Sequence, residues 1–431
     1  RGGELLVSAA AGSGKTRVLV ERLLARVEDE GHDIDEFLVI TFTNAAAAEL
    51  RGRIAQELSQ RLARDPGNSH LRRQTVLVYK ARICTIDALC IDLLRQYGHL
   101  LDVDPDFRIC DQAEGDAIAL RVLDELLDAR YENIGDDPGF AGLVEAILTG
   151  RDDTRLMNIV LDIHARIQSH PDPDRWLIRH REDFRAEGVT DAGETAWGAL
   201  ILNHARAQAD YWRGEMAKAL NLAAADPVVD LNYGPTLSAT LEGLEALSEA
   251  ESWDRAAACF PVPFPKAGVK RGADPAVKEA VAELRKRCKT RMETVELLFG
   301  ADSASVLAEL RTLAPAVETL FDLVREFGQR YYQEKTRRGL LEFSDAEHLA
   351  VRLLERFEVR EVLREQFTEI MVDEYQDTNE VQNVLFDALS QDGENLFLVG
   401  DVKQSIYRFR LADPTIFLGK YESWPPAALA E

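Results

Sequence analysis

Short apolar runs near the start of the chain alternate with segments that carry apolar residues at helical spacing. The runs cover residues 5–7, 37–43 and 81–86. The helical segments cover residues 17–24, 45–51 and 86–97. Asn44 precedes the second helical segment, where its side chain can cap a helix. This alternation predicts an α/β domain with a parallel sheet over residues 1–110.

The pattern changes between residues 111 and 339, where strand signals are scarce and long amphipathic helical segments dominate. Two of these segments cover residues 113–131 and 276–299. Proline-containing breaks at residues 169–174 and 260–268 indicate loops. No repeat of fixed period runs through the region. We therefore expect a mainly helical inserted domain.

The α/β pattern returns from residue 340. A short apolar run at residues 370–372 ends in Asp373 and Glu374, and a second run at residues 395–400 ends in Asp401. The expected fold class is thus α/β, with one parallel-sheet domain interrupted by a helical domain. Its three expected parts are residues 1–110, 111–339 and 340–431.

Composition narrows the class of protein. The 431 residues, 46% of them hydrophobic, fit a soluble protein with more than one domain. No apolar run is long enough to cross a bilayer and no signal peptide opens the chain, so we expect no membrane and a cytoplasmic location. The five cysteines form no C-x-x-C pair, which gives zinc or iron–sulfur binding no support. A net charge of −24 argues against broad adhesion to nucleic acid but leaves room for a narrow basic groove.

A glycine-rich segment separates the first apolar run from the first helical segment. Such a loop directs backbone N–H groups at phosphate oxygens, and the positive end of the helix dipole adds to the attraction. Lys15 can reach the β- and γ-phosphates, and the Thr16 hydroxyl can bind Mg²⁺. A chance glycine-rich turn is the alternative, and the strand–loop–helix context disfavours it. The residues expected to bind ATP are Ala9, Ala10, Ala11, Gly12, Ser13, Gly14, Lys15 and Thr16.

Asp373 and Glu374 form a second nucleotide signal. An acid at the carboxyl end of a buried strand, beside a phosphate-loop strand, can bind Mg²⁺, and Asp373 fits this role. Glu374 then stays available to orient and deprotonate a water molecule. Two acids in a solvated turn are the alternative. That interpretation weakens because the sequence continues as Asp-Glu-x-Gln-Asp-Thr after a hydrophobic strand.

A third segment, residues 398–410, combines a neutral amide with alternating aromatic and basic residues. Gln404 could sense the γ-phosphate by hydrogen bonding. Tyr407 and Phe409 alternate with Arg408 and Arg410, which suits stacking on unpaired bases together with phosphate contact. An amphipathic strand with core aromatics explains the alternation equally well, so both interpretations stay open.

Four segments occur in an order that resembles motifs I, Ia, II and III of the UvrD/Rep-type superfamily 1 DNA helicases. They are Ala-Gly-Ser-Gly-Lys-Thr, Thr-Phe-Thr-Asn-Ala-Ala-Ala-Ala-Glu-Leu, Val-Asp-Glu-Tyr-Gln-Asp-Thr and Gly-Asp-x-x-Gln-Ser-Ile-Tyr-x-Phe-Arg. Residues 104–109 and 169–173 resemble the AddA branch, the RecB-like helicase–nuclease subunits. The resemblance covers nearly the whole chain and implies that the sheet domain is RecA-like.

The resemblance also implies a role for each matching residue. Glu374 and Gln404 are the implied catalytic residues, the first activating water and the second sensing the γ-phosphate. Thr16 and Asp373 are the implied Mg²⁺ ligands, and Arg17 lies where family members contact the nucleotide. The residues implied to contact single-stranded DNA are Phe42, Thr43, Asn44, Thr85, Tyr407, Phe409 and Arg410. For Phe42, a place in the core is an equally good interpretation.

The function that the resemblance implies is ATP-dependent, 3′-to-5′ translocation on DNA by a helicase–nuclease that processes double-strand ends. The implied ligands and partners are ATP, Mg²⁺, DNA and an AddB-like partner subunit. We expect the chain to be the first motor domain of a longer protein. Asp87 departs from the family pattern, which usually has His there, and its carboxylate would repel a phosphate. Two other classes stay open: an ATP-binding module without motor activity, and a P-loop enzyme that acts on a small molecule.

Overall fold

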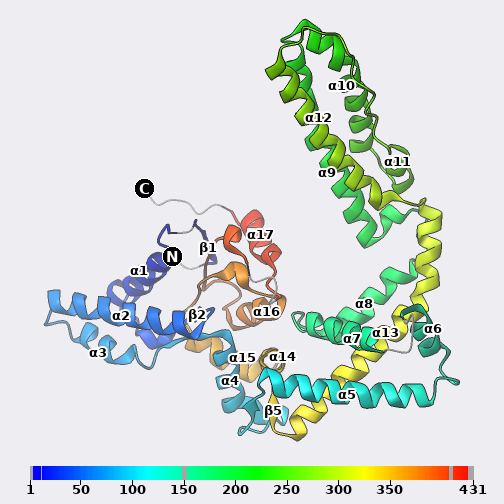
Figure 1. Ribbon diagram of the computed structural model, residues 1–431. Helices are drawn as coiled ribbons and strands as arrows, with labels where there is room; N and C mark the ends of the chain where they lie inside the picture. Colours follow the sequence, from blue (N-terminus) through cyan, green and yellow to red (C-terminus); the bar gives the residue numbers. More distant parts are fainter. Residues whose placement is uncertain (1–2, 11, 148–152, 407–410, 426–431) are drawn as a thin grey trace. The chain divides into compact units, whose positions relative to one another are not determined.

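A five-stranded parallel sheet forms the centre of the α/β part (Figure 1). The computed structural model describes residues 3–10, 12–147, 153–406 and 411–425. The strands lie in the order β1-β7-β6-β2-β3. They are β1 (Leu5–Ser8), β2 (Phe37–Thr41), β3 (Arg82–Thr85), β6 (Glu369–Val372) and β7 (Leu396–Gly400). The predicted α/β fold with a parallel sheet is confirmed, and the two late strands lie between β1 and β2.

The register brings the carboxyl ends of the strands to one edge of the sheet. Ser8 at the end of β1 lies opposite Gly400 at the end of β7. Thr41 at the end of β2 lies opposite Thr85 at the end of β3, and Val372 of β6 pairs with Ile40 of β2. The segments that follow these strands therefore emerge close together, as is usual for ligand sites in open α/β sheets.

Helices cover both faces of the sheet because alternate strand residues point to opposite sides. In β2, Phe37 and Val39 pack with the first three helices, whereas Leu38 and Ile40 pack with the other layer. The first layer consists of α1 (Lys15–Asp29), α2 (Asn44–Arg64) and α3 (Ser69–Leu77). The second consists of α4 (Ile86–Tyr97), α14 (Phe343–Leu354), α15 (Phe357–Gln366), α16 (Glu380–Leu389) and α17 (Pro414–Ser423).

Threonines cap the helices that follow β2 and β3. The Thr43 hydroxyl accepts a hydrogen bond from the Ala46 N–H at 3.1 Å, and the Thr85 hydroxyl accepts one from the Ala88 N–H at 3.3 Å. The prediction that Asn44 caps α2 is wrong. Thr43 has the extended backbone that a cap residue needs, whereas Asn44 is already the first helical residue.

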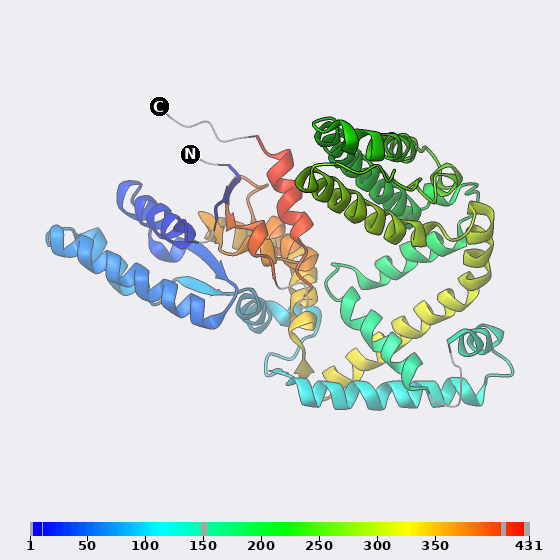
Figure 2. The same cartoon turned by 45° about the horizontal axis from the view of Figure 1, so that its top comes forward.

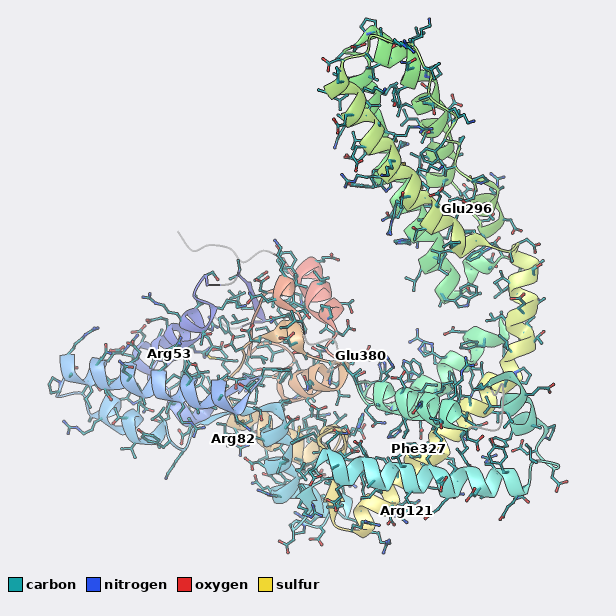
Figure 3. All side chains as sticks on the ribbon, in the orientation of Figure 1. Arg53, Arg82, Arg121, Glu296, Phe327 and Glu380 are labelled. Carbon is teal, nitrogen blue, oxygen red and sulfur yellow. The ribbon has the colours of Figure 1, made fainter. Side chains whose placement is uncertain are left out.

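A short second sheet marks the place where the helical segment leaves and rejoins the α/β part. Strand β4 (Arg108–Ile109) pairs in parallel with β5 (Leu340–Leu341). Helix α5 (Gln112–Glu132) follows β4 and helix α13 (Ser303–Arg337) precedes β5, while α7 (Thr154–Ile167) packs against the last part of α13. Their side chains pack together: the His164 ring of α7 meets the Phe327 ring of α13 edge-on, with centroids 5.0 Å apart. Figure 3 labels Phe327 on α13 and Arg121 on α5.

The chain divides into two compact units. The first comprises residues 1–133, 151–176 and 323–431, and the second comprises residues 134–150 and 177–322. In the second unit, α9 (Ala196–Ala223) packs along α10 (Pro227–Ser248) and α12 (Pro275–Glu296), as Figures 1 and 2 both show. Helix α6 (Pro138–Ile147) and the short α11 (Trp253–Ala258) also belong to this unit. The expected domain limits at residues 110 and 339 stay a prediction. The unit that holds the sheet also contains α5 and α7.

Three features of the described part of the chain concern membranes, metal ions and thiols. There, no helix combines the length and the apolar character that crossing a membrane requires. The same residues contain no group of three or more His, Cys, Asp or Glu side chains arranged to hold a metal ion. All five cysteines have free thiols.

Candidate functional site

The loop between β1 and α1 presents the positive end of a helix. Gly12 and Gly14 have φ angles of 72° and 91°, in the left-handed region that glycine adopts at little cost. Helix α1 begins directly after Gly14; among the described residues no side chain caps it, and its first turn contains no acid. Lys15 and Arg17 add positive charge to this turn. Such an uncapped helix start favours an anionic ligand.

Lys15 and Thr16 lie against the two acids that follow β6. The Lys15 ammonium pairs with Glu374 Oε2 at 3.3 Å, and its side chain is only 8% exposed. The Thr16 hydroxyl donates to Asp373 Oδ2 at 3.3 Å. The fold thus brings the glycine-rich loop and the acid pair together across more than 350 residues of sequence.

The backbone at Glu374 turns sharply. Its φ of 55° is unusual for a residue with a side chain and costs about 1–2 kcal/mol. The Asp373 N–H still continues the sheet by donating to the Ile40 carbonyl at 2.9 Å, and the Glu374 N–H donates to Asp373 Oδ1 at 3.1 Å. Strain of this kind is typical of functional sites, where the surrounding structure holds it in place.

Thr16 and Asp373 provide the ligand types that Mg²⁺ prefers. Hydroxyl and carboxylate oxygens are hard ligands, and Mg²⁺ is usually held by one or two carboxylates together with substrate phosphates. Burial raises the pKa of Asp373, and the Glu374 charge raises it further. A bound cation would offset both effects, so the residues present fit a magnesium ion.

Gln404 follows the end of β7. Its side-chain amide donates to Asp401 Oδ2 at 2.6 Å, and this bond lowers the pKa of Asp401. Gln404 lines a pocket of about 350 Å³ whose walls also contain Thr16, Asp373 and Glu374. The fold therefore brings the four residues expected to bind metal, activate water and sense phosphate around one pocket.

The residues expected to contact DNA lie at the ends of β2 and β3. Phe42 is half-buried and lines both the 350 Å³ pocket and a larger cavity of about 870 Å³. Thr43 also lines the smaller pocket, while Asn44 is exposed at the start of α2. Thr85 is buried and lines the larger cavity. Ala11, Tyr407, Phe409 and Arg410 lie outside the described residues.

The larger cavity is acidic. Asp87 and Glu347 line it, and the described residues of its wall include neither lysine nor arginine. Burial raises the pKa of Glu347 to about 7, with Asp87 as a further contributor. The acidic lining disfavours a phosphate group near Asp87, as the Asp87 carboxylate alone already does.

Sequence reasoning missed three polar residues of the site: Gln376 and Asp377 line the 350 Å³ pocket, and Asp401 contacts Gln404. Gln376, Asp377 and Asp401 are all buried, and each hydrogen-bonds to another residue of the two acid-containing segments. Burial raises the pKa of Asp377 to about 6, and the neighbouring Glu374 charge adds to the shift. The motifs contain all three residues, so their position in those motifs was the one available signal.

Relatives of known name match the chain along nearly its whole length. It is 36% identical over 447 residues to the A subunit of the ATP-dependent helicase/nuclease of Acetivibrio thermocellus, covering 98% of this chain and 35% of that protein. The protein of the same name from Syntrophomonas wolfei is 38% identical over 443 residues, covering 99% of this chain and 34% of the relative. The one from Bacillus licheniformis is 37% identical over 447 residues, with 98% and 35% covered.

The chain thus spans about a third of the length of the curated relatives that it matches. A family model described as the UvrD/REP helicase N-terminal domain matches residues 1–425. The four motif segments lie within that match, and the sheet supports both nucleotide motifs at one edge. The chain therefore belongs to the UvrD/REP helicase N-terminal domain family.

Proposed function

We propose that this chain is the first ATP-hydrolysing motor part of a DNA helicase, within a helicase–nuclease that processes double-strand DNA ends. The observation that carries the proposal is the 350 Å³ pocket. Its wall combines the phosphate-loop residue Thr16, the acids Asp373 and Glu374, the amide of Gln404 and the aromatic ring of Phe42. A pocket of this composition can link the state of a nucleotide to the position of a nucleic-acid strand.

The phosphate loop would bind the nucleotide. Residues 9–17 supply backbone N–H groups and the positive end of α1, and Lys15 supplies a cation for the β- and γ-phosphates. Lys15 now pairs with Glu374, so a phosphate group would compete for its ammonium. Thr16 and Asp373 would hold Mg²⁺, which would neutralise developing charge on the phosphates.

Glu374 would act as the general base. Its side chain is 38% exposed and lies on the wall of the pocket, where it would be open to a water molecule beside a bound terminal phosphate. Release of Lys15 to the phosphates would leave this carboxylate free to accept a proton. Gln404, on the same wall, would sense the terminal phosphate by hydrogen bonding.

The DNA strand would contact the segments after β2 and β3. Phe42 offers an aromatic face for base stacking, and Thr43, Asn44 and Thr85 offer polar groups for the backbone. The Thr43 and Thr85 oxygens accept helix-capping bonds, which leaves each hydroxyl hydrogen able to donate to a phosphate. Tyr407, Phe409 and Arg410 would contact the same strand, as the family resemblance implies.

The relatives' name suggests further partners. It describes each relative as one subunit of a helicase/nuclease, which implies a companion chain, and we propose an AddB-like partner for this chain. Translocation in the 3′-to-5′ direction, a cytoplasmic location and a three-part division at residues 110 and 339 belong to the same proposal. They rest on the family resemblance.

ATP turnover by the full-length protein, with and without single-stranded DNA, tests the proposed function. We expect turnover that DNA stimulates, and loss of strand displacement when ATP is omitted. Turnover that is indifferent to DNA would favour a P-loop enzyme for small molecules. Tight ATP binding without turnover would favour a binding module.

Phe42→Ala separates a stacking role from a packing role. Base stacking contributes about 1–3 kcal/mol per base, so we expect weaker binding of a labelled oligonucleotide in fluorescence anisotropy, at unchanged ATP affinity. Asn44→Ala is the control for a polar contact in the same segment. A Phe42→Ala protein that melts earlier but binds DNA like wild type would assign this ring to packing.

A further inference from the structure

The side chain of Gln376 is buried in the wall of the candidate site and connects its two halves. It is 1% exposed. Its amide nitrogen donates to Glu374 Oε2 at 2.9 Å and to Asp377 Oδ2 at 3.2 Å. Its carbonyl oxygen accepts from the Asp401 N–H at 2.8 Å. One neutral side chain therefore touches both the acid expected to activate water and the segment that follows β7.

Gly400 makes this contact possible. A Cβ atom on Gly400 would lie 2.5 Å from Gln376 Oε1 and 2.8 Å from the Phe417 ring, which real structures do not tolerate. The Gly400 carbonyl also accepts from the Ala9 N–H at 3.1 Å, at the start of the phosphate loop. The end of β7 is thus packed against the Gln376 amide and bonded to the start of the nucleotide loop.

The connection continues to Gln404. The Asp401 backbone N–H is bonded to Gln376, and the Asp401 carboxylate accepts from Gln404 Nε2 at 2.6 Å. Asp401 also accepts from the Lys403 N–H at 3.1 Å, which fixes the turn between them. A continuous series of hydrogen bonds therefore runs from the Glu374 carboxylate through Gln376 and Asp401 to Gln404.

From this series we infer that Gln376 is a positioning residue that couples Gln404 to Glu374. The inference rests on the proposed function, because it assigns to that site the link between its phosphate sensor and its base. A shift of Gln404 toward a terminal phosphate pulls on Asp401, and Gln376 passes the shift to the Glu374 carboxylate. Gln376 acts through the Glu374 carboxylate, and its side chain also contributes to the wall of the 350 Å³ pocket.

A purely structural role is the competing explanation, since buried amides are normally hydrogen-bonded wherever they occur. The two explanations differ in what they predict for paired substitutions. If Gln376 only supports the fold, changes at Gln376 and Gln404 act independently and their fold-losses multiply. If Gln376 couples the two residues, the second substitution removes a link that the first has already broken.

Gln376→Met, Gln404→Ala and the double variant test this in the full-length protein. Methionine keeps the length and volume of the side chain and removes all three hydrogen bonds. The readouts are kcat and KM for ATP in the presence of single-stranded DNA, the nucleotide Kd and the melting temperature. We expect Gln376→Met to lower kcat roughly 10- to 100-fold, since misplacing a catalytic group by about 1 Å can cost 10²-fold, with KM and Kd within about twofold of wild type.

Gln74→Met is the matched control. Gln74 in α3 is 0% exposed, accepts from the Ile34 N–H at 2.9 Å and bonds Asp33 at 2.7 Å, far along the chain from both acid-containing segments. It should lower the melting temperature about as much as Gln376→Met and leave kcat unchanged. Gln376→Leu serves where the methionine variant fails to fold, because it removes the same hydrogen bonds with a side chain of similar volume and adds no charge beside Glu374 and Asp377.

The kcat values of the single and double variants distinguish coupling from a purely structural role. A double variant no more than about twofold slower than the slower single variant supports the coupling. Multiplied losses, or a Gln376→Met kcat like that of Gln74→Met, overturn it while the proposed function stands. Absence of ATP turnover in the wild type contradicts the proposed function and the inference with it.

Discussion

The two edge strands of the sheet carry helices that begin in opposite ways. After β1, helix α1 starts behind Gly14, without a side-chain cap among the described residues and with Lys15 in its first turn. After β3, helix α4 starts behind Thr85, whose hydroxyl caps it, and its first turn contains Asp87. One helix start leaves its N–H groups and its dipole for a ligand. The other satisfies one of its N–H groups with the Thr85 hydroxyl and has a carboxylate, Asp87, near its positive end.

This difference indicates where an anion can bind along the carboxyl ends of the strands. Of the helices that directly follow β1, β2 and β3, only α1 has no side-chain cap among the described residues, and Lys15 lies in its first turn. At the β3 unit the Asp87 and Glu347 carboxylates line the cavity wall. The most direct ways to break or sharpen the contrast are substitutions at the residues of the two helix starts and at the acids beside them, Glu374 and Glu347.

Lys15→Ala should have the largest effect. It removes a buried cation from the phosphate loop, and we expect no measurable binding of ATP with Mg²⁺ in isothermal titration calorimetry. Lys80→Ala is the control, because Lys80 is an exposed lysine just before β3, at the other edge. Equal affinities in wild type and Lys15→Ala would remove the basis for the contrast.

Glu374→Gln should come next. A glutamine can still hydrogen-bond a water molecule but cannot accept its proton, so we expect single-turnover hydrolysis to fall by about 10²–10⁴ while ATP binding persists. Glu49→Gln provides the comparison, since Glu49 lines the same pocket but pairs with Arg53 at 2.6 Å on the surface of α2. Hydrolysis at a near-normal rate would assign the base to another group.

Glu347→Gln should change how stability depends on pH. Burial and Asp87 raise the pKa of Glu347 to about 7 from 4.5, and Gln382 donates to its Oε1 at 2.7 Å. The folded state therefore binds more protons than the unfolded state between these values, and the contribution of Glu347 to stability is lost as pH rises from about 4.5 through 7.

We therefore expect the thermal stability of Glu347→Gln, measured relative to wild type, to increase from pH 5 to pH 8. The gain is at most a few kcal/mol, at roughly 1.4 kcal/mol per pKa unit. Calorimetric melting of both proteins at the two pH values measures it. A constant difference across that range would mean that Glu347 stays charged in the folded protein.

Thr85→Ala should have the smallest effect of the four. Loss of a helix cap typically costs about 1 kcal/mol, so we expect a lower melting temperature with unchanged ATP affinity. Thr85→Ser keeps the capping oxygen and should restore the melting temperature. If Thr85→Ala impaired nucleotide binding, the two edges of the sheet would be less independent than their helix starts suggest.

The sequence allowed the strands, the glycine-rich loop and the acid pair to be predicted because each has a strong local signal. The run at residues 370–372, for example, is apolar and short, and β6 covers Glu369–Val372. The cap of α2 was misassigned because Thr43 and Asn44 are both good capping residues, and only the backbone conformation distinguishes them.

Long-range arrangements could not be predicted from local patterns. Nothing in the apolar spacing reveals that β6 and β7 lie between β1 and β2, because strand order depends on pairing between distant segments. The role inferred for Gln376 has the same origin. A neutral amide has no distinctive spacing, and its partner Asp401 becomes its neighbour only in the folded sheet.

The strand order has a consequence for how the chain matures during synthesis. Strand β3 ends at residue 85 and β6 begins at residue 369, so at roughly 5–20 residues per second the ribosome needs on the order of tens of seconds to supply β6. Strand β1 waits longer still, because its one neighbour in the sheet is β7. The nucleotide loop is translated well before β7 and is fixed in place only once β7 pairs with β1. A nascent chain that stops before β7 would carry the whole glycine-rich sequence and still be unable to hold a nucleotide.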